Sequence, residues 1–325
     1  MKKDKLTFQD VEDAYKRIQP YVYQTPLEHS IYLSKGDQQV YFKCENLQSI
    51  KAFKIRGALN KMLSMSEAEK ELGVSTVSSG NHGIAVSYAA NMLGIKKAVI
   101  IVPKTTPISK IEKIKYYGGE VLLMGENYDG AHTLGMKYIK DHQMTFIDSY
   151  YDDPLIYAGQ GTIGLEILEQ NPDIDTILVP IGGGGMLTGI AVAAKAIKPA
   201  ITIIGIQTQA CPALIKAFED HVFYEEYPSE PSICDALVGG IGKLCYDMAE
   251  DYVDDYIAVK ESSIEKAIVH MINSEKLVVE PAGAVGVAAV MDYLEQIDGH
   301  HIAIVISGGN IDSKLMLKLL NKYQS

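Results

Sequence analysis

Short runs of β-branched residues alternate with longer amphipathic stretches through most of the chain. Each run has the length of a buried strand, and each stretch repeats its apolar positions at helical spacing. The expected strand and helix pairs are residues 74–77 with 83–93, 97–102 with 109–117, 176–180 with 186–197, and 200–206 with 212–218, followed by a strand at 302–306. Gly94 and the pair Gly118 and Gly119 stand where helices of this pattern end. The alternation predicts parallel α/β units and a doubly wound α/β fold.

The length of 325 residues predicts about two domains. No repeat, low-complexity stretch or long Pro, Gly or Ser linker separates them, so the two should pack closely. We predict a large domain of residues 1–65 and 148–325 and a small inner domain of residues 66–147. A ligand cleft is expected between them, where the carboxyl ends of strands open onto loops.

Composition excludes several classes of protein. Hydrophobic residues make up 47% and charged residues 22% of the chain, which is ordinary for a globular protein, and no apolar run is long enough for a membrane span. The net charge of −11 argues against nucleic acid as a partner. No secretory or transit signal is recognisable at the first residues, which predicts a cytoplasmic protein. The four cysteines and eight histidines lack metal-ligand spacing, so no metal site is predicted.

The sharpest motif is a run of four glycines between an apolar strand and an amphipathic helix. It consists of Gly182, Gly183, Gly184 and Gly185 and is followed by Met186. Glycines let the backbone approach an anion closely, and the helix start adds partial positive charge. The run lacks the Gly-Lys-Ser/Thr ending of a Walker loop. It is interpreted as a phosphate cradle, and a tight strand-to-helix turn is the alternative.

A second strand-to-helix loop carries polar side chains. Ser78, Ser79, Gly80, Asn81 and His82 offer hydroxyls, an amide and backbone N–H groups at a helix start. Such a loop suits a carboxylate. Simple helix capping by one of the side chains is the alternative.

One lysine stands in an unusual setting. Lys54 lies between the apolar residues Phe53 and Ile55, in a segment that follows an extended stretch and opens a helix expected at residues 59–65. An amine held in apolar surroundings near a cofactor has a lowered pKa and becomes nucleophilic. Lys54 is therefore the candidate nucleophile, and a solvated lysine at a helix start is the alternative.

These motifs occur in a recognisable order, which ends with a fourth loop from Ser307 to Asn310. Together with the segments 158–163 and 280–283, they resemble the fold-type II pyridoxal-phosphate enzymes over essentially the whole chain. The resemblance is closest to serine/threonine dehydratases and serine racemase. It implies two α/β domains of the tryptophan-synthase-β-like kind with the active site between them, pyridoxal 5'-phosphate as cofactor, an amino-acid substrate, and a homodimer or higher homo-oligomer.

The resemblance also assigns roles. Lys54 would bind the cofactor aldehyde, Asn81 would meet the ring hydroxyl, and Ser307 would meet the ring nitrogen. The residues expected at the cofactor are Phe53, Lys54, Asn81, Gly182, Gly183, Gly184, Gly185, Met186, Glu280 and Ser307. The residues expected at the substrate are Ser78, Ser79, Gly80, Asn81 and His82.

Two reactions follow from these roles. A neutral Ser307 hydroxyl does not stabilise a protonated ring nitrogen as a carboxylate would, which favours α,β-elimination. With Lys54 as the base at Cα, a β-hydroxy amino acid such as L-threonine or L-serine would yield a 2-oxo acid and ammonia. The alternative is a racemase in which Lys54 and Ser79 act on opposite faces of Cα, because serine racemase carries serine at the position of Ser79.

Several positions depart from the family pattern. Lys51 and Ala52 replace the usual Gly-Ser before the cofactor lysine, and Ala236 replaces the usual glycine after Asp235. These changes argue against strict threonine specificity. The short stretch after Ser307 leaves no room for the regulatory domain of biosynthetic threonine dehydratases.

The metal site that some members carry is not expected. Its carboxylate positions are occupied by Gln207, Cys211 and Ala213, none of which supplies a hard anionic oxygen. Aromatic stacking on the cofactor is not expected either, and six tyrosines are interpreted as core or interface residues: Tyr21, Tyr23, Tyr116, Tyr117, Tyr150 and Tyr151.

Overall fold

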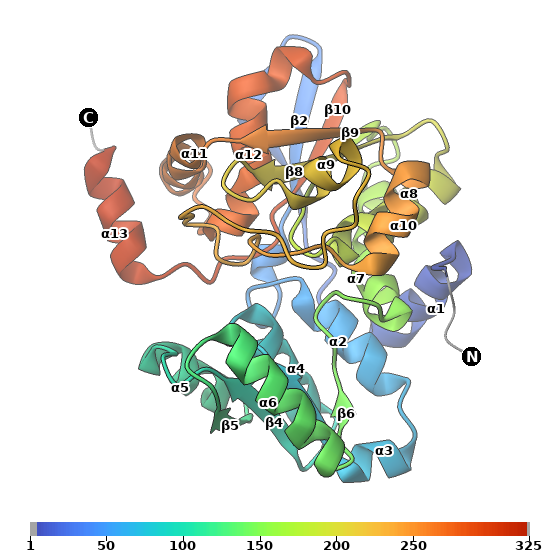
Figure 1. Cartoon of the computed structure of the whole chain (residues 1–325). Coiled ribbons are helices and arrows are strands. Elements are labelled where there is room, and N and C mark those ends of the chain that lie inside the picture. The colour runs from blue at the N-terminus through green and yellow to red at the C-terminus, as the bar shows by residue number, and fades with distance from the viewer. Residues whose placement is uncertain (1–4, 324–325) are drawn as a thin grey trace.

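The computed structural model describes residues 5–323 and contains two β-sheets flanked by helices (Figure 1). The large sheet has six strands in the order β1 (Leu27–Lys35), β2 (Gln38–Lys43), β10 (His301–Val305), β7 (Thr176–Pro180), β8 (Thr202–Thr208) and β9 (Asp255–Val259). All neighbouring strands are parallel except β1, which runs antiparallel to β2 at one edge.

The small sheet is fully parallel. Its order is β5 (Glu120–Leu123), β4 (Ala98–Val102), β3 (Val74–Val77) and β6 (Thr145–Phe146). The predicted α/β fold with parallel sheets is confirmed. All four strands fall within the range 66–147, although the boundaries of the two domains stay a prediction.

Helices cover both faces of each sheet. On the large sheet, one face is covered by α1 (Phe8–Ile18), α7 (Pro154–Gln170), α8 (Gly185–Ile197), α9 (Ala213–Glu219) and α10 (Lys243–Tyr252), and the other by α11 (Glu261–Asn273), α12 (Pro281–Tyr293) and α13 (Ser313–Lys322). On the small sheet, α4 (Asn81–Met92) and α5 (Ile108–Tyr116) lie on one face and α6 (Tyr128–Asp141) on the other, with α3 (Glu67–Leu72) near β6. Single 3-10 turns occur at Glu45–Leu47 and Leu294–Gln296. The layers are those of two doubly wound units.

Local sequence explains where several helices begin and end. Thr7 and Ser66 each form a capping box with an acidic residue three positions later, at the starts of α1 and α3. Asp153 caps α7, whose first residue is Pro154. Gly94 has φ of +69°, a left-handed conformation that glycine adopts without strain after a helix end.

Helix α2 (Lys54–Leu63) links the two parts of the molecule. It packs against α4 of the small sheet and against α7 of the large sheet, and it lies between the sheets in Figure 1. The helix begins at Lys54, five residues earlier than its expected start at Leu59. The early start fixes the Lys54 backbone in the first helical turn.

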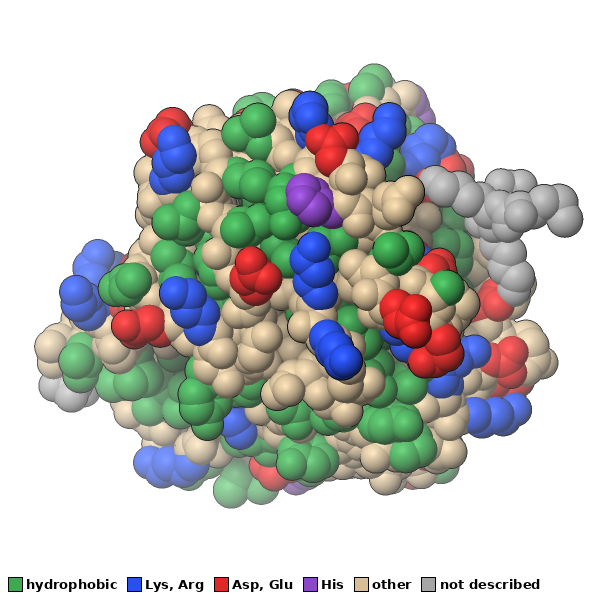
Figure 2. Space-filling view, turned by 90° about the horizontal axis from the view of Figure 1, so that it is seen from below, with side chains coloured by type: hydrophobic (Ala, Val, Ile, Leu, Met, Phe, Trp, Pro, Cys, Tyr) green, Lys and Arg blue, Asp and Glu red, His purple; other side chains and the backbone are tan. Residues whose placement is uncertain are grey.

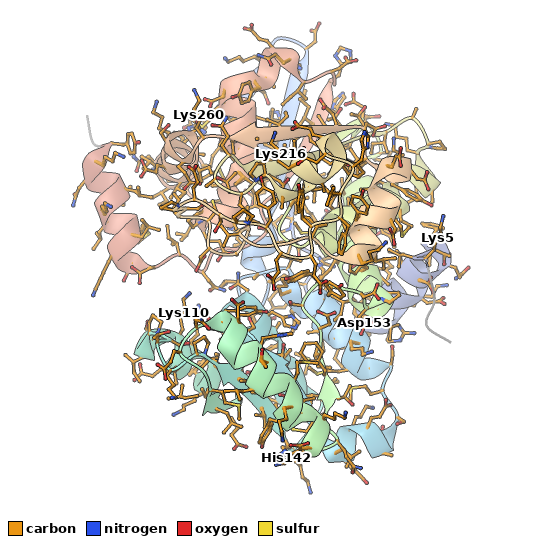
Figure 3. The ribbon with its side chains drawn as sticks, in the orientation of Figure 1. Lys5, Lys110, His142, Asp153, Lys216 and Lys260 are labelled. Carbon is orange, nitrogen blue, oxygen red and sulfur yellow. The ribbon has the colours of Figure 1, made fainter. Side chains whose placement is uncertain are left out.

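Polar contacts also join the two parts. Lys110 of α5 pairs with Asp235 at 3.1 Å, and the Lys110 label in Figure 3 lies on the side of the small sheet that faces the large one. Lys61 of α2 pairs with Asp153 at the start of α7 at 2.7 Å. These ion pairs tie α5 of the small sheet to the segment before α10 and tie α2 to the start of α7.

The surface mixes charged and apolar side chains. On the face seen from below, Lys and Arg side chains are spread among acidic and apolar ones (Figure 2). Among residues 5–323, no helix has the length and apolar character that crossing a bilayer requires.

Candidate active site

The Lys54 segment lies directly beside the loop that follows β10. The Phe53 N–H donates to the Ser307 carbonyl at 3.0 Å, and the Gly309 N–H donates to the Lys51 carbonyl at 2.9 Å. Ala52 and Gly308 form an isolated β-bridge. The lysine motif and the Ser307 loop, distant in sequence, thus form one side of the cleft.

Polar side chains connect this side of the cleft to the small sheet. The Asn81 Nδ2 donates to Glu280 Oε1 at 2.7 Å, and the Asn81 Oδ1 accepts from Asn310 Nδ2 at 2.7 Å. Asn310 also donates its backbone N–H to Glu280 Oε2 at 3.1 Å. The start of α4, the start of α12 and the Ser307 loop therefore converge on a single network. The side chain of Asn310 takes part in this network, although the sequence motif alone did not assign it a role.

The Lys54 amine points toward the segment that precedes α7. Its Nζ donates to the Ser149 carbonyl at 3.0 Å and lies 5.3 Å from the centre of the Phe53 ring. Burial lowers the pKa of Lys54 to about 8, and the Asp148 carboxylate opposes that shift. At pH 7 about a tenth of the amine is therefore neutral, far more than for an ordinary lysine, which favours nucleophilic reaction.

Two other ionisable groups in the cleft are also shifted toward their neutral forms. Burial raises the pKa of Glu280 to about 7, against the opposing hydrogen bond from Asn81. Burial, together with the Lys54 charge, lowers the pKa of His82 to about 4. Shifts of this kind are typical of functional clefts.

The His82 ring faces inward. Its Nε2 lies 2.9 Å from the Ile147 carbonyl, which can only accept, so Nε2 carries the proton of the neutral ring.

The start of α4 also presents backbone N–H groups. Helix α4 has Gly80 as its N-cap, and no side chain of the described chain caps it. Ser78 Oγ accepts the N–H group of Gly80 at 3.3 Å, but no described side chain caps the first turn of α4, so its N–H groups remain available to an anion.

The four-glycine loop leads into α8 in the same way. Gly184 is the N-cap with φ of +92°, and no side chain of the described chain caps the helix. A Cβ on Gly183 would lie 2.0 Å from the Tyr150 ring, and one on Gly184 would lie 2.1 Å from Cys245 Sγ. Side chains already fill the space around the loop, so only glycine fits. The free N–H groups of the first turn form a cradle for an anion.

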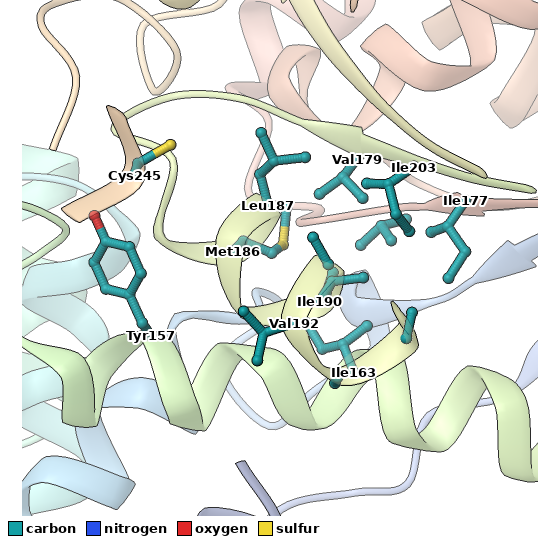
Figure 4. Packing of buried hydrophobic residues seen from close by; sticks show 14 of the residues in the cluster. Tyr157, Ile163, Ile177, Val179, Met186, Leu187, Ile190, Val192, Ile203 and Cys245 are labelled. Atoms are coloured by element: carbon teal, nitrogen blue, oxygen red, sulfur yellow. The ribbon is translucent and has the colours of Figure 1, made fainter. Parts of the chain in front are cut away.

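Apolar side chains pack around the start of α8, next to the glycine loop. Met186 and Leu187 point into the core, and Tyr157 and Cys245 lie at the amino end of α8 (Figure 4). The Tyr157 hydroxyl donates to the Tyr150 carbonyl at 2.6 Å. Because the Met186 side chain is in the core, the backbone is the part of this residue that can meet an anion.

Tyr150, predicted to be a core or interface residue, has a more specific contact in the structure. Its ring is half-buried against Gly183 in the glycine loop. No hydrophobic pattern marks this residue, because it lies in an irregular segment between β6 and α7. Only the tertiary contact identifies it.

The positions of the family's metal site have internal partners. Gln207 Oε1 accepts the N–H groups of Leu214 and Ile215, so it caps α9. The Cys211 thiol lies 3.3 Å from the Gly239 N–H. Among residues 5–323, no group of three or more His, Cys, Asp or Glu side chains is placed to hold a metal ion. The absence of a metal requirement stays a prediction.

Comparison with known proteins identifies the family. The sequence profile of the family described as pyridoxal-phosphate dependent enzyme matches residues 18–308. The chain belongs to this family. It is 39% identical to an L-threonine ammonia-lyase of Thermotoga maritima, covering 98% of this chain and 79% of that protein. It is 37% identical to a catabolic L-threonine dehydratase of Staphylococcus aureus, covering 93% and 88%.

Solved structures of pyridoxal-phosphate dependent enzymes share the fold. Maize serine racemase superposes with a TM-score of 0.90 at 34% identity, covering 98% of both chains. The expected fold-type II architecture and the expected cofactor, pyridoxal 5'-phosphate, are thereby confirmed. The site fits that cofactor, because an uncapped glycine cradle for a phosphate and an amine of lowered pKa for an aldehyde are joined by the segment 148–152.

Proposed function

We propose that this protein is an ammonia-lyase that eliminates water from a β-hydroxy amino acid such as L-threonine or L-serine, giving a 2-oxo acid and ammonia. The main observation behind the proposal is the Lys54 amine. Its pKa is about 8, and it donates a hydrogen bond to the Ser149 carbonyl. Two relatives named threonine ammonia-lyase and threonine dehydratase align over nearly the whole chain.

Each group of the site has a task in this reaction. Pyridoxal phosphate, when bound, supplies the electron sink that makes the Cα proton of the substrate acidic. Lys54 would hold the cofactor aldehyde in the resting enzyme, and its amine would serve as the base for the Cα proton of the substrate. The N–H groups of the glycine loop and of Met186 would hold the phosphate.

The remaining side chains orient the ring and the substrate. Asn81 and Glu280 lie on one side of the Lys54 segment and are assigned to the ring hydroxyl and its surroundings. Ser307, which is buried, is assigned to the ring nitrogen as a neutral partner. The uncapped N–H groups and hydroxyls from Ser78 to His82 are assigned to the substrate carboxylate.

A racemase is the second candidate. Ser79 is half-buried immediately before α4, in the loop assigned to the substrate carboxylate. Its hydroxyl is the candidate proton donor on the face of Cα opposite to Lys54. Maize serine racemase is among the structural neighbours, which supports testing this activity.

One assay tests both activities. The purified enzyme is incubated with L-serine, L-threonine, D-serine and 3-hydroxyaspartate, and 2-oxo acid release is measured together with the chirality of the remaining amino acid. Oxo acid from one substrate supports the lyase and names its preference. Inverted amino acid with little oxo acid supports the racemase. Neither product from a yellow, cofactor-loaded protein contradicts both.

A variant separates the two mechanisms. Ser79→Ala removes the hydroxyl and leaves the backbone N–H groups in place, so elimination should persist while racemisation is lost. Loss of both reactions in a folded Ser79→Ala protein would contradict the two-base mechanism.

We further propose a cytoplasmic homodimer or higher homo-oligomer. Apolar side chains exposed along the edge strand β1, including Ile31 and Tyr32, support self-association. Light scattering coupled to size-exclusion chromatography measures the mass directly, and a monomer at micromolar concentration would contradict this part of the proposal.

A further inference from the structure

The irregular segment 148–152 lies between the two ends of the cleft. At one end, the Ser149 carbonyl accepts the Lys54 amine at 3.0 Å. At the other, the Tyr150 ring packs on Gly183 so closely that a Cβ there would be 2.0 Å away. Two residues in sequence thus contact the amine that holds the cofactor and the loop that cradles its phosphate.

One carboxylate holds this segment in shape. Asp148 Oδ1 accepts the N–H groups of Tyr150 and Tyr151, each at 3.1 Å, and Asp148 Oδ2 accepts the N–H group of Asp152 at 3.2 Å. Three backbone donors on one ionised group form a closed turn, since charge-assisted hydrogen bonds are stronger than neutral ones. The Tyr157 hydroxyl adds a fourth bond by donating to the Tyr150 carbonyl.

The same carboxylate also acts on Lys54 electrostatically. Burial lowers the pKa of the Lys54 amine, and Asp148 is the group that raises it. His82 of α4 also lies within electrostatic range of the amine, and it is neutral at physiological pH because burial and the Lys54 charge lower its pKa to about 4. Asp148 therefore provides the opposing charge for the amine, and His82 provides none.

We propose that Asp148 is a positioning residue that folds segment 148–152 into a bracket between Lys54 and the glycine loop. The proposal rests on Lys54 being the cofactor lysine. The turn depends on the acceptor atoms of Asp148, and the charge of the same group acts on the amine, so substitutions can separate the two effects.

Two variants separate the acceptor from the charge. Asp148→Asn removes the charge and keeps an Oδ1 that accepts the N–H groups of Tyr150 and Tyr151, although its Nδ2 no longer accepts the N–H group of Asp152. Asp148→Ala removes both. Asp251→Asn is the matched control, since Asp251 is an exposed aspartate on α10.

The first readout is the pKa of the Lys54 amine in cofactor-free protein. It is measured by an NMR titration of ¹³C-labelled lysine side chains, with the Lys54 signal assigned by its loss in Lys54→Met. We expect Asp148→Asn to lower this pKa by about one unit, because the opposing charge is gone. Asp251→Asn should leave the value unchanged.

The second readout is the rate at which pyridoxal phosphate enters the cofactor-free protein, followed by visible absorbance as a function of pH. The neutral amine is the reactive form, so the midpoint of the Asp148→Asn profile should move to lower pH with the amine. Asp148→Ala should in addition bind the cofactor about tenfold more weakly, because the turn that places Tyr150 on Gly183 is lost.

The outcomes distinguish this proposal from the proposed function. If Lys54→Met still develops the same absorbance, the cofactor lysine is misassigned and the proposed function fails. If Lys54→Met stays colourless but Asp148→Asn shifts neither the amine pKa nor the pH profile, the electrostatic role of Asp148 is wrong. If folded Asp148→Ala, checked by circular dichroism, binds the cofactor as the wild type does, the bracket is wrong.

Discussion

Lys54 and Arg56 are two residues apart on α2, yet their pKa values shift in opposite directions. Burial lowers the pKa of Lys54 to about 8, with Asp148 as the opposing charge. For Arg56, burial acts in the same direction, but Glu45 and Glu166 together raise the pKa above its ordinary value. Arg56 is fully buried and Lys54 only half-buried, so the carboxylate partners of Arg56 outweigh its greater burial.

The surroundings of Arg56 form a closed ionic network. Its Nε donates to Glu45 at 2.7 Å and its Nη1 donates to Glu166 at 2.6 Å. Lys43 binds Glu166 at 2.6 Å, and the Thr25 hydroxyl donates to Glu45 at 2.6 Å. These ionic side chains are fully buried, and the network joins α2 to β2 and α7. The paired charges anchor the helix, while the weakly paired Lys54 remains free to react.

The largest expected effect is at Lys54. Lys54→Met removes the amine, so cofactor absorbance should vanish and activity should fall at least about a thousandfold. The cofactor-free variant should nevertheless be more stable at pH 7, by about 1–2 kcal/mol, because a buried and weakly paired cation is gone. Urea unfolding of both proteins measures this. Lys115→Met, at an exposed lysine of α5, is the control, and a destabilised Lys54→Met would contradict the comparison.

Arg56→Met should have the opposite sign. It leaves Glu45 and Glu166 without their main cation in the interior, and breaking such a buried pair costs about 3–5 kcal/mol. Urea unfolding should show this loss, and Arg56→Lys should fall in between because one ammonium cannot reach both carboxylates with the arginine geometry. Wild-type stability of Arg56→Met would show that the network does not anchor α2.

Glu280 extends the comparison to an acid. Its folded pKa of about 7 lies above the ordinary value of 4.5, so between these two pH values the folded state keeps a proton that the unfolded state has released. The contribution of Glu280 to stability is therefore present below about pH 4.5 and is lost as pH rises through 7. In cofactor-free protein, Glu280→Gln should remove this decline, which we expect to be about 1–3 kcal/mol. Parallel pH dependences of the two proteins in urea unfolding would argue that Glu280 titrates normally.

Lys51 provides the smallest effect. Exposed Lys51 has φ of +62°, a left-handed conformation that is unfavourable for residues with a Cβ. Lys51→Gly relieves the strain but gives the unfolded chain more freedom, so a net gain of up to about 0.5 kcal/mol is expected. Lys51→Ala should give no gain. Equal melting temperatures for both variants would show that the backbone at Lys51 is unstrained.

The sequence pattern located the elements that carry strong local signals. Strands β3 and β7 lie at the predicted residues, because both are short, fully buried segments rich in β-branched residues. Strand β1 was missed, since an edge strand alternates irregularly between exposed and buried positions. The start of α2 was placed five residues late, because Lys54 and Arg56 look polar in sequence although Arg56 is buried.

Motifs with a strong local signal could also be located from the sequence. The four glycines and the loop after β3 are local signals, so their place at helix starts was visible from the residues alone. Asp148 and Tyr150 carry no such signal, because their importance comes from Lys54 and Gly183, which are far away in sequence.

The sequence by itself determined the family, the cofactor and the order of the loops, because each depends on short runs of residues whose chemistry is local. The tertiary structure decided the protonation states and the supporting contacts. Lys54 and Arg56 are both basic residues next to apolar ones, and nothing local distinguishes them. Only folding brings two carboxylates to Arg56 and one to Lys54, and a buried charge is stable in proportion to the partners that it finds.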